Sequence, residues 1–306
     1  MALGGIHLLL SYRCTHECDH CFVWGSSQAR GTMTLAQIHA ILDQAQAVDS
    51  VYSICFEGGE PFLFYPIMLA GLREAAARGF KRGIVTNSYW ATSVDDAVEW
   101  LRPIAEIGVD SLSLSSDLFH GEEMLTTEAQ NGIEAAKRLG LPEDIITIDV
   151  PEGCAAYADK EKGEPVTGGV VRFKGRAAVK LTEGVALKPW REFTECPDED
   201  FTGLGRVHVD ALGYVHICQG LSIGNLWVKP LKEIVETYDP AQHPIIGPLV
   251  KGGPAALVEH YDLPLKGEYA DACHLCYLAR DMLRKRFPAE LAPPTMYGEL
   301  EGEESE

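Results

Sequence analysis

The order of hydrophobic patterns along the chain constrains the fold more than any other feature. From Ile6 to about Val150, short runs rich in β-branched residues alternate with longer stretches of helical periodicity. Such alternation is typical of a parallel sheet whose strands are joined by crossover helices. Six strand–helix units fit the pattern and eight do not, so the sequence predicts an α/β fold with a partial (β/α)6 barrel. The predicted strands are 6–12, 51–56, 83–86, 111–115, 145–150 and 169–173, and the predicted helices are 34–45, 65–78, 93–107 and 122–139.

A different pattern begins after about Leu181. In residues 206–217, apolar and polar residues alternate on both sides of a turn that contains a glycine, and this pattern predicts a β-hairpin. Short helices are predicted at 230–238 and 255–261, and a last helix at 272–287. We therefore divide the chain into a barrel (1–181), a small α+β domain (182–288) and a tail (289–306). The tail ends in GELEGEESE, which is too acidic and too poor in apolar residues to order itself.

The composition of the chain limits the classes of binding partner and the cellular environment that we expect for it. A net charge of -19 argues against nucleic acid or an anionic membrane, because binding to either depends on clustered Lys and Arg. No apolar run approaches the roughly 20 residues of a membrane span, and the first residues lack the basic region of a signal peptide. Nine cysteines without a secretion signal indicate a reducing, cytoplasmic setting and metal ligation rather than disulfides.

Three cysteines follow the first predicted strand directly. Cys14, Cys18 and Cys21 have the spacing C-x3-C-x2-C, which brings three thiolates together in one short loop. Three ligands on a cubic four-iron cluster leave one iron open to a small molecule, and an open position marks catalysis rather than structure. The alternative is a zinc site, whose fourth ligand would be His16 or His20.

The second predicted strand ends in Gly58-Gly59-Glu60-Pro61, at the same end of the sheet as the cysteine loop. This carboxyl end is where α/β barrels place their chemistry. The glycines let the backbone approach a ligand closely, and Glu60 offers a carboxylate to a protonated amine. Alone, GGEP could be an ordinary turn, but beside the cysteine motif it is specific.

With these two motifs the sequence resembles the radical S-adenosylmethionine (SAM) superfamily, from Ile6 to about Leu181. The resemblance implies a TIM-like partial barrel, a [4Fe-4S] cluster on Cys14, Cys18 and Cys21, and SAM on the open iron. It also implies an external electron donor such as flavodoxin or ferredoxin, and a 5'-deoxyadenosyl radical that takes a hydrogen atom from substrate. SAM contacts are expected from Phe22, Gly58, Gly59, Glu60, Pro61, Thr86, Asn87, Ser115, Ser116, Asp117 and Arg176. Arg176 could equally be a surface arginine.

Four further cysteines lie in the second part of the chain: Cys196, Cys218, Cys273 and Cys276. Spacing alone does not separate a zinc site from an iron–sulfur site, and a third alternative is that these are unligated core cysteines. The segment resembles the twitch domain, the shortened form of the SPASM extension, which implies an auxiliary [4Fe-4S] cluster. With four protein ligands such a cluster has no iron left for substrate, so its expected role is electron transfer or support of the fold.

Three polar residues remain as candidates for acting on substrate. Asp117 and His120 follow the fourth predicted strand, where a base could stand, although Asp117 could instead cap the next helix. Cys154 follows the fifth strand and could donate a hydrogen atom, although free cysteines are often buried apolar residues. Cys55, inside the second strand, is expected in the core.

The expected reaction is oxidation of a small polar molecule, with the auxiliary cluster as electron acceptor. The cysteine order resembles that of twitch-bearing dehydrogenases, and the chain starts at the first barrel strand without a leader-binding domain before it. The main alternative is a maturase that modifies a ribosomal peptide or protein. A more remote one is a non-enzymatic iron–sulfur electron-transfer protein.

Overall fold

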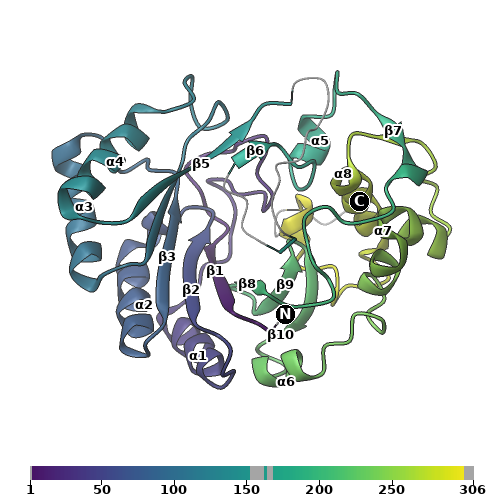
Figure 1. Cartoon of the computed structure of the whole chain (residues 1–306), viewed down its shortest axis with the longest axis horizontal. Helices are drawn as coiled ribbons and strands as arrows, with labels where there is room; N and C mark the ends of the chain where they lie inside the picture. The colour runs from purple at the N-terminus through teal and green to yellow at the C-terminus, as the bar shows by residue number, and fades with distance from the viewer. Residues whose placement is uncertain (1, 152–161, 164–167, 300–306) are drawn as a thin grey trace.

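A single curved sheet organises the molecule in the computed structural model, which describes residues 2–151, 162–163 and 168–299. Its strand order is β10-β9-β8-β1-β2-β3-β4-β5-β6, and β1 lies inside the sheet between β8 and β2 (Figure 1). Each strand from β1 to β6 pairs in parallel with the next, and β8 pairs in parallel with the other edge of β1. The predicted α/β fold with a large parallel sheet is confirmed.

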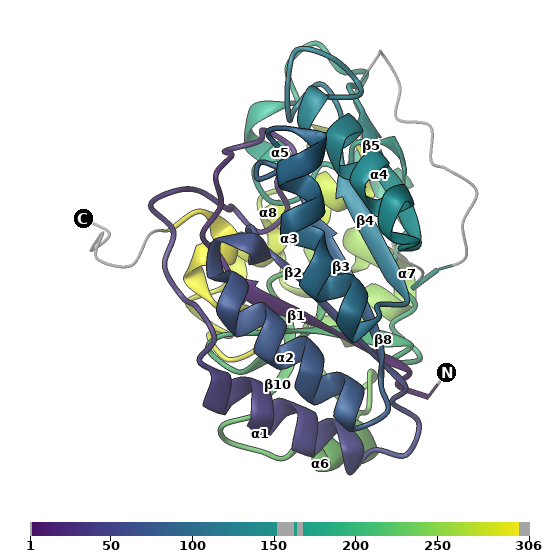
Figure 2. The ribbon, with the colours of Figure 1, turned by 90° about the vertical axis from the view of Figure 1, so that its left-hand side faces the viewer.

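The six predicted barrel strands and their helices occur in the expected order. The four helices lie side by side over the outer face of the sheet (Figure 2). The strands are β1 (Gly5–Ser11), β2 (Ser53–Gly58), β3 (Lys81–Thr86), β4 (Ser111–Ser115), β5 (Glu143–Asp149) and β6 (Gly168–Val170), and the helices are α1 (Leu35–Gln46), α2 (Tyr65–Ala77), α3 (Val94–Ile107) and α4 (Thr127–Leu139).

Local sequence explains where these helices begin. Thr34 and Gln37 form a reciprocal capping box at the start of α1, and the face bearing Ile38 and Ile41 is buried. Helix α4 begins at Thr127 rather than at residue 122, because the side chain of Thr126 accepts the amide hydrogen of Ala129 and caps the helix there.

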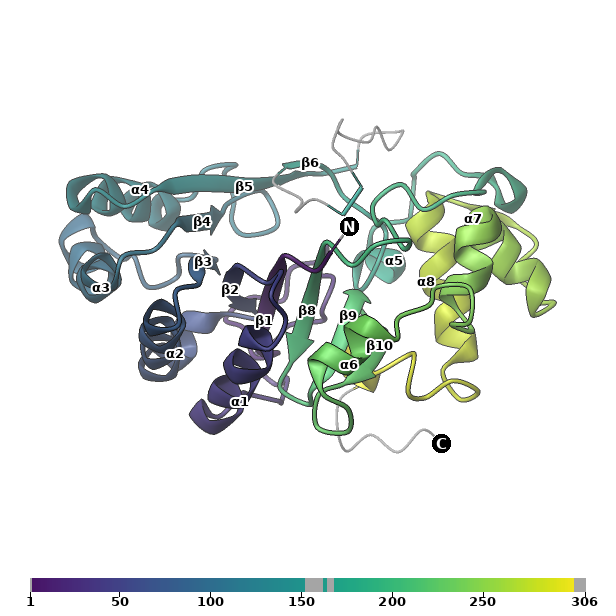
Figure 3. The ribbon, with the colours of Figure 1, turned by 60° about the horizontal axis from the view of Figure 1, so that its bottom comes forward.

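The predicted hairpin forms, but it does not stand apart from the barrel. Strand β8 (Arg206–Asp210) pairs in parallel with β1, and β9 (Tyr214–Cys218) and β10 (Leu221–Asn225) continue the same sheet in antiparallel fashion (Figure 3). β1 offers unpaired backbone groups on the side away from β2, and β8 satisfies them. The barrel sheet therefore extends past the boundary that we predicted at residue 181.

Helices and short strands fill the remaining carboxyl-terminal part. Helix α7 is longer than predicted and is kinked at Gly252 and Gly253, where the backbone leaves helical geometry. The elements are α5 (Ala177–Lys180), β7 (Lys188–Pro189), α6 (Leu231–Glu236), α7 (Ile246–His260), β11 (Glu268–Tyr269) and α8 (Ala272–Leu283), with 3-10 turns η1 (Pro61–Phe64), η2 (Trp190–Glu192) and η3 (Pro294–Tyr297).

The first part of the predicted tail is ordered. We expected disorder from residue 289, but Leu291 and Met296 are buried and the Tyr297 hydroxyl donates to the carbonyl of Gly220 at 2.7 Å. Apolar residues that precede the acidic stretch explain the difference, because they add surface to the core. Within the described ranges, no helix combines the length and apolar character needed to cross a membrane.

Candidate active site and a second cysteine site

The cysteine loop and the GGEP turn are joined through their backbones. The amide of Glu60 donates to the carbonyl of Arg13 at 2.8 Å, and that of Gly59 donates to Ser11 at 2.6 Å. A Cβ on Gly59 would lie 2.1 Å from the Arg13 carbonyl oxygen, and one on Gly58, where φ is +127°, would lie 2.6 Å from that of Ser11. The two glycines therefore allow β2 to end directly against the start of the loop.

The three thiols lie in a setting that suits a cluster. Backbone amides donate to two sulfurs, from His16 to Cys14 at 3.4 Å and from Gly25 to Cys21 at 3.2 Å. Burial raises the pKa of Cys14 to about 11 and raises that of Cys18 further. Partly buried thiols ionise when they bind metal, and amide donors to the sulfurs stabilise the resulting thiolates. The donor set thus fits an iron–sulfur cluster.

Arg176 supports this loop rather than standing at the surface. Its guanidinium donates to the carbonyls of Cys18 at 2.7 Å and Gly25 at 2.8 Å, and its backbone amide donates to the carbonyl of Cys21 at 2.9 Å. The exposed alternative for Arg176 is therefore wrong, and contact with a SAM or substrate carboxylate stays a prediction. Phe22, in the same loop, is partly buried against the core.

Glu60 joins the loop to the end of β3. Its buried carboxylate accepts hydrogen bonds from the Phe62 amide (3.0 Å), the Thr86 hydroxyl (2.9 Å) and the Asn87 amide (2.8 Å). Burial raises the pKa of Glu60 to about 7 despite these donors. The Asn87 side chain also donates to the Cys14 sulfur at 3.4 Å. Four residues predicted from separate segments thus meet at one place, and Pro61 is buried beside them at the start of η1.

The end of β4 carries a second polar group. Asp117 is buried and accepts hydrogen bonds from His120 Nδ1 (2.8 Å) and from the amide of Ile148 (3.1 Å). Although burial opposes it, the hydrogen bond and charge of His120 hold the pKa of Asp117 below its usual value. Asp117 does not cap α4, so that alternative is wrong, but the local contact of His120 is observed.

Ser116 closes the loop between β4 and α4. Its hydroxyl donates to the carbonyl of Met124 at 3.0 Å and accepts from the amide of Thr126 at 2.8 Å. Ser115 is partly buried at the strand end. SAM contacts by either serine stay predictions, and Cys154 lies outside the described residues.

The four remaining cysteines converge on one cavity. Cys196, Cys218, Cys273 and Cys276 all line it, together with two cations, Lys174 and Arg280. Cys218 is the last residue of β9, and Cys273 and Cys276 lie in the first turns of α8. These thiols come together because the hairpin and the helix close on one site, as predicted.

Two cations beside the four cysteines would offset part of the negative charge that four thiolates bring. Although burial opposes it, neighbouring Cys218 and Asp198 hold the pKa of Lys174 above its usual value. The Arg280 guanidinium, which is 2% exposed, donates to the carbonyl of Gln219 at 3.0 Å, and its Nε has no hydrogen-bond partner. A buried cation is costly unless it is paired, so Arg280 and the half-buried Lys174 fit an anionic metal–thiolate group, in a cavity that Asp198 and Glu199 also line. No spacing signal in the sequence marked either cation.

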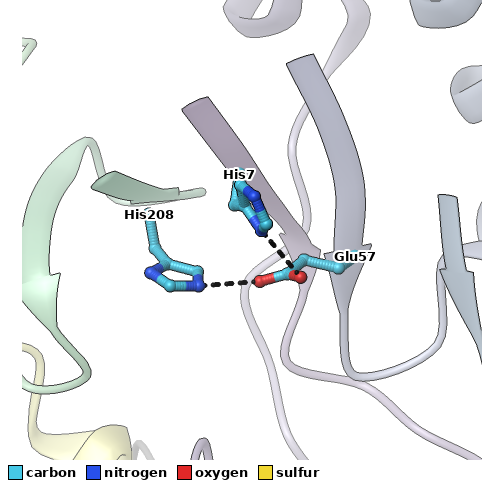
Figure 4. A group of neighbouring side chains, drawn as sticks. All are labelled: His7, Glu57 and His208. Atoms are coloured by element: carbon cyan, nitrogen blue, oxygen red, sulfur yellow. Dashed lines mark hydrogen bonds and ion pairs between the residues drawn. The ribbon is translucent and has the colours of Figure 1, made fainter. Parts of the chain in front are cut away.

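A third group of polar side chains was not predicted from the sequence. His7, Glu57 and His208 meet on the inner side of the sheet (Figure 4). His7 Nδ1 lies 3.0 Å from Oε2 of Glu57, and His208 Nε2 lies 3.0 Å from Oε1. These residues are far apart in the sequence, and only the pairing of β8 with β1 brings them together.

These features define an α/β barrel domain with a cysteine loop at the carboxyl end of its first strand. Residues 8–151 match the family model of the Radical SAM superfamily, so this part of the chain is a radical SAM domain. Such a domain implies a [4Fe-4S] cluster and SAM as cofactors.

Two curated relatives match part of the chain. It is 32% identical over 123 residues to the tungsten-containing aldehyde ferredoxin oxidoreductase cofactor-modifying protein of Pyrococcus furiosus, covering 40% of this chain and 33% of that protein. It is 23% identical over 155 residues to YydG of Bacillus subtilis, which is named for peptide biosynthesis, covering 51% of this chain and 47% of YydG. The matches span less than half of either relative.

Among solved structures, the chain resembles Streptococcus suis SuiB bound to its precursor peptide SuiA. The TM-score is 0.51 at 15% identity, covering 84% of this chain and 73% of SuiB. This likeness concerns the fold.

Proposed function

We propose that the protein is a radical SAM oxidoreductase that dehydrogenates a small polar molecule and uses a second iron–sulfur cluster as electron acceptor. When bound, the cluster of the first loop and SAM supply a 5'-deoxyadenosyl radical that takes a hydrogen atom from substrate. The residues of the chain hold the two cofactor sites, and the strand ends around Glu60, Asn87 and Asp117 offer polar contacts beside the first of them.

The second cysteine site carries this proposal. Four buried or partly buried thiols line one cavity with Lys174 and Arg280, and a cluster held by all four would have no iron open to an outside ligand, which suits electron transfer. Among the described residues, the sets of three His, Cys, Asp or Glu ligand atoms that lie within 4.8 Å of one another contain no cysteine. A tetrahedral zinc would hold its sulfurs about 3.8 Å apart. The wider spread favours a cluster over a single zinc.

The inner face of the barrel is polar, which supports a polar substrate. Alternation along β2 and β4 directs Phe56 toward α2 and Leu114 toward α4, since each side chain meets a helical glycine there. Glu57 and Ser113 therefore face the interior, and the hydroxyl of Ser113 donates to Asp144 at 2.7 Å.

Peptide modification is the second candidate, and the comparisons favour it. YydG is named for peptide biosynthesis, and SuiB binds a precursor peptide. A short precursor peptide encoded beside this protein would support this candidate, whereas neighbouring genes for sugar or cofactor biosynthesis would support the dehydrogenase.

Iron analysis after anaerobic reconstitution tests the proposal. We expect about eight irons per chain, falling to about half when Cys14, Cys18 and Cys21 are replaced together by alanine. Replacing Cys196 and Cys218 should also halve the iron, while SAM and dithionite still yield 5'-deoxyadenosine. Zinc in place of iron in the triple variant would refute the second cluster, and absence of 5'-deoxyadenosine from the fully loaded protein would refute radical SAM activity.

A further inference from the structure

The group formed by His7, Glu57 and His208 has no part in the two cysteine sites. The three residues lie on neighbouring strands β1, β2 and β8, and His7 and His208 are direct partners across the β1–β8 pair. Their side chains point toward one another on the inner face of the sheet (Figure 4). Part of His7 (17%) and part of Glu57 (12%) stay exposed, so a small ion can reach them.

The contacts within this group leave one oxygen unsatisfied. His7 Nδ1 and Glu57 Oε2 form a hydrogen bond of 3.0 Å. Oε1 of Glu57 is buried and has no hydrogen-bond partner, although His208 Nε2 lies 3.0 Å away. A cation bound between the carboxylate and the imidazole nitrogens would supply the partner that Glu57 Oε1 lacks.

We propose that His7 Nδ1, His208 Nε2 and the carboxylate of Glu57 bind a divalent transition-metal ion of the zinc class. The three ligand atoms all lie within 4.8 Å of one another, and two imidazoles with one carboxylate are a donor set that such ions prefer. Three protein ligands leave a coordination position open on the barrel interior. Water, or an oxygen or nitrogen of the substrate, would occupy that position.

Two neighbours of His208 affect how tightly the ion binds. Arg206 Nη1 lies 3.5 Å from Nδ1 and 3.3 Å from Nε2 of His208, and Gln219 Nε2 lies 3.5 Å from Nε2. An atom nearly equidistant from both ring nitrogens lies over the face of the ring rather than in its plane. The positive charge of Arg206 opposes a cation, so we expect an exchangeable ion rather than a permanent structural one.

A similar group, His20, Asp117 and His120, serves as a comparison. Its ligand atoms also lie within 4.8 Å of one another. However, both oxygens of Asp117 already accept hydrogen bonds, one from His120 and the other from the amide of Ile148. This group therefore leaves no carboxylate oxygen in need of a cation.

Zinc binding to the cluster-loaded protein tests the proposal. The anaerobically reconstituted chain is dialysed against micromolar zinc, and bound zinc and iron are measured by mass spectrometry. We expect one zinc more per chain in the wild type than in His208→Ala or Glu57→Gln, with equal iron in all three. His120→Ala, the matched control, should retain the zinc. An equal amount of bound zinc per chain in the wild type, His208→Ala and Glu57→Gln would overturn the proposal.

X-ray absorption at the zinc edge of the wild type keeps the test independent of how the variants fold. The proposed site predicts nitrogen and oxygen ligands at about 2.0–2.1 Å, whereas zinc in a cysteine site would show sulfur at about 2.3 Å. A spectrum of sulfur ligands alone would refute the site. Because iron content reports the cysteine sites separately, failure here is distinguishable from failure of the proposed function.

Discussion

Backbone contact at Gly59 decides whether the cysteine loop can take its shape. The residue packs against the carbonyl of Arg13, one position before the first cysteine, and backbone atoms cannot rotate away as a side chain could. The GGEP motif predicted close approach to a ligand, but the described contact is with the loop itself. A motif can thus locate a site correctly while the reason for each residue is visible only in the fold.

Replacing Gly59 with alanine should disrupt the first site only. The added Cβ would lie 2.1 Å from the Arg13 carbonyl oxygen, so the loop must shift. We expect about half of the reconstituted iron to be lost, together with SAM-dependent 5'-deoxyadenosine formation. Gly267→Ala is the control, because a Cβ there has no atom within 4 Å. Full iron in Gly59→Ala would show that the loop tolerates the shift.

His208 should make the cluster-free protein sensitive to acid. Burial lowers its pKa in the folded state to about 3, whereas the unfolded chain has the ordinary value near 6.5. Between these values the unfolded state binds more protons, so the free energy of unfolding falls as pH falls below 6.5. His208→Gln should reduce this slope by up to about 1.4 kcal/mol per pH unit.

Urea unfolding between pH 5 and 6.5, with a chelator present, measures this slope. His39→Gln provides the comparison, because the His39 side chain is 40% exposed. Equal slopes in the wild type and His208→Gln would show that His208 is not held neutral by burial.

At the scale of elements, the segment from Arg172 to Arg176 connects the two cysteine sites. Arg176 holds the backbone of the first loop, and Lys174, two residues earlier, lines the second cavity. Gly175 between them adopts φ +60°, and a Cβ there would lie 2.6 Å from the carbonyl oxygen of Cys21. The predicted sixth strand ends at residue 173, within this segment, and the sequence gave no sign that the segment touches both sites.

Lys174 should raise the reduction potential of a cluster bound at the second cysteine site. A buried cation stabilises the more negative, reduced state of a cluster, so its removal should make reduction harder. We expect Lys174→Met to lower the reduction potential of the second cluster by on the order of 60 mV, a tenfold change in the one-electron equilibrium constant. Electron paramagnetic resonance at controlled potentials measures it, with exposed Lys180→Met as control. An unchanged potential would mean that Lys174 does not act on a cluster there.

The sequence predicted elements better than it predicted their partners. Strand and helix periodicity located the barrel units and the hairpin because these depend on neighbouring residues. The pairing of β8 with β1 joins residues about 200 positions apart, and local patterns carry no information about it. His7, Glu57 and His208 were missed for the same reason, whereas the cysteine loop could be recognised because its three cysteines lie within one short segment.

At the scale of the whole molecule, one core runs through both predicted domains. It includes Leu3 and Leu8 of the amino-terminal part and Leu257 and Tyr297 of the carboxyl-terminal part. The described sheet is also continuous from β6 to β10. Cooperative unfolding follows contacts rather than sequence order, so the two parts should not melt separately.

The chain should therefore unfold in one step and should not tolerate division at residue 181. Trp90 and Trp190 are both buried, one in each part, and fluorotryptophan resonances report them separately. We expect both signals to change with the same urea midpoint in the cluster-free protein. A fragment of residues 1–181 would expose the β8-facing edge of β1 and its apolar neighbours, so it should aggregate, as unpaired edges do. Two separate midpoints, or a soluble fragment that binds about four irons, would instead establish residues 1–181 as an independent domain.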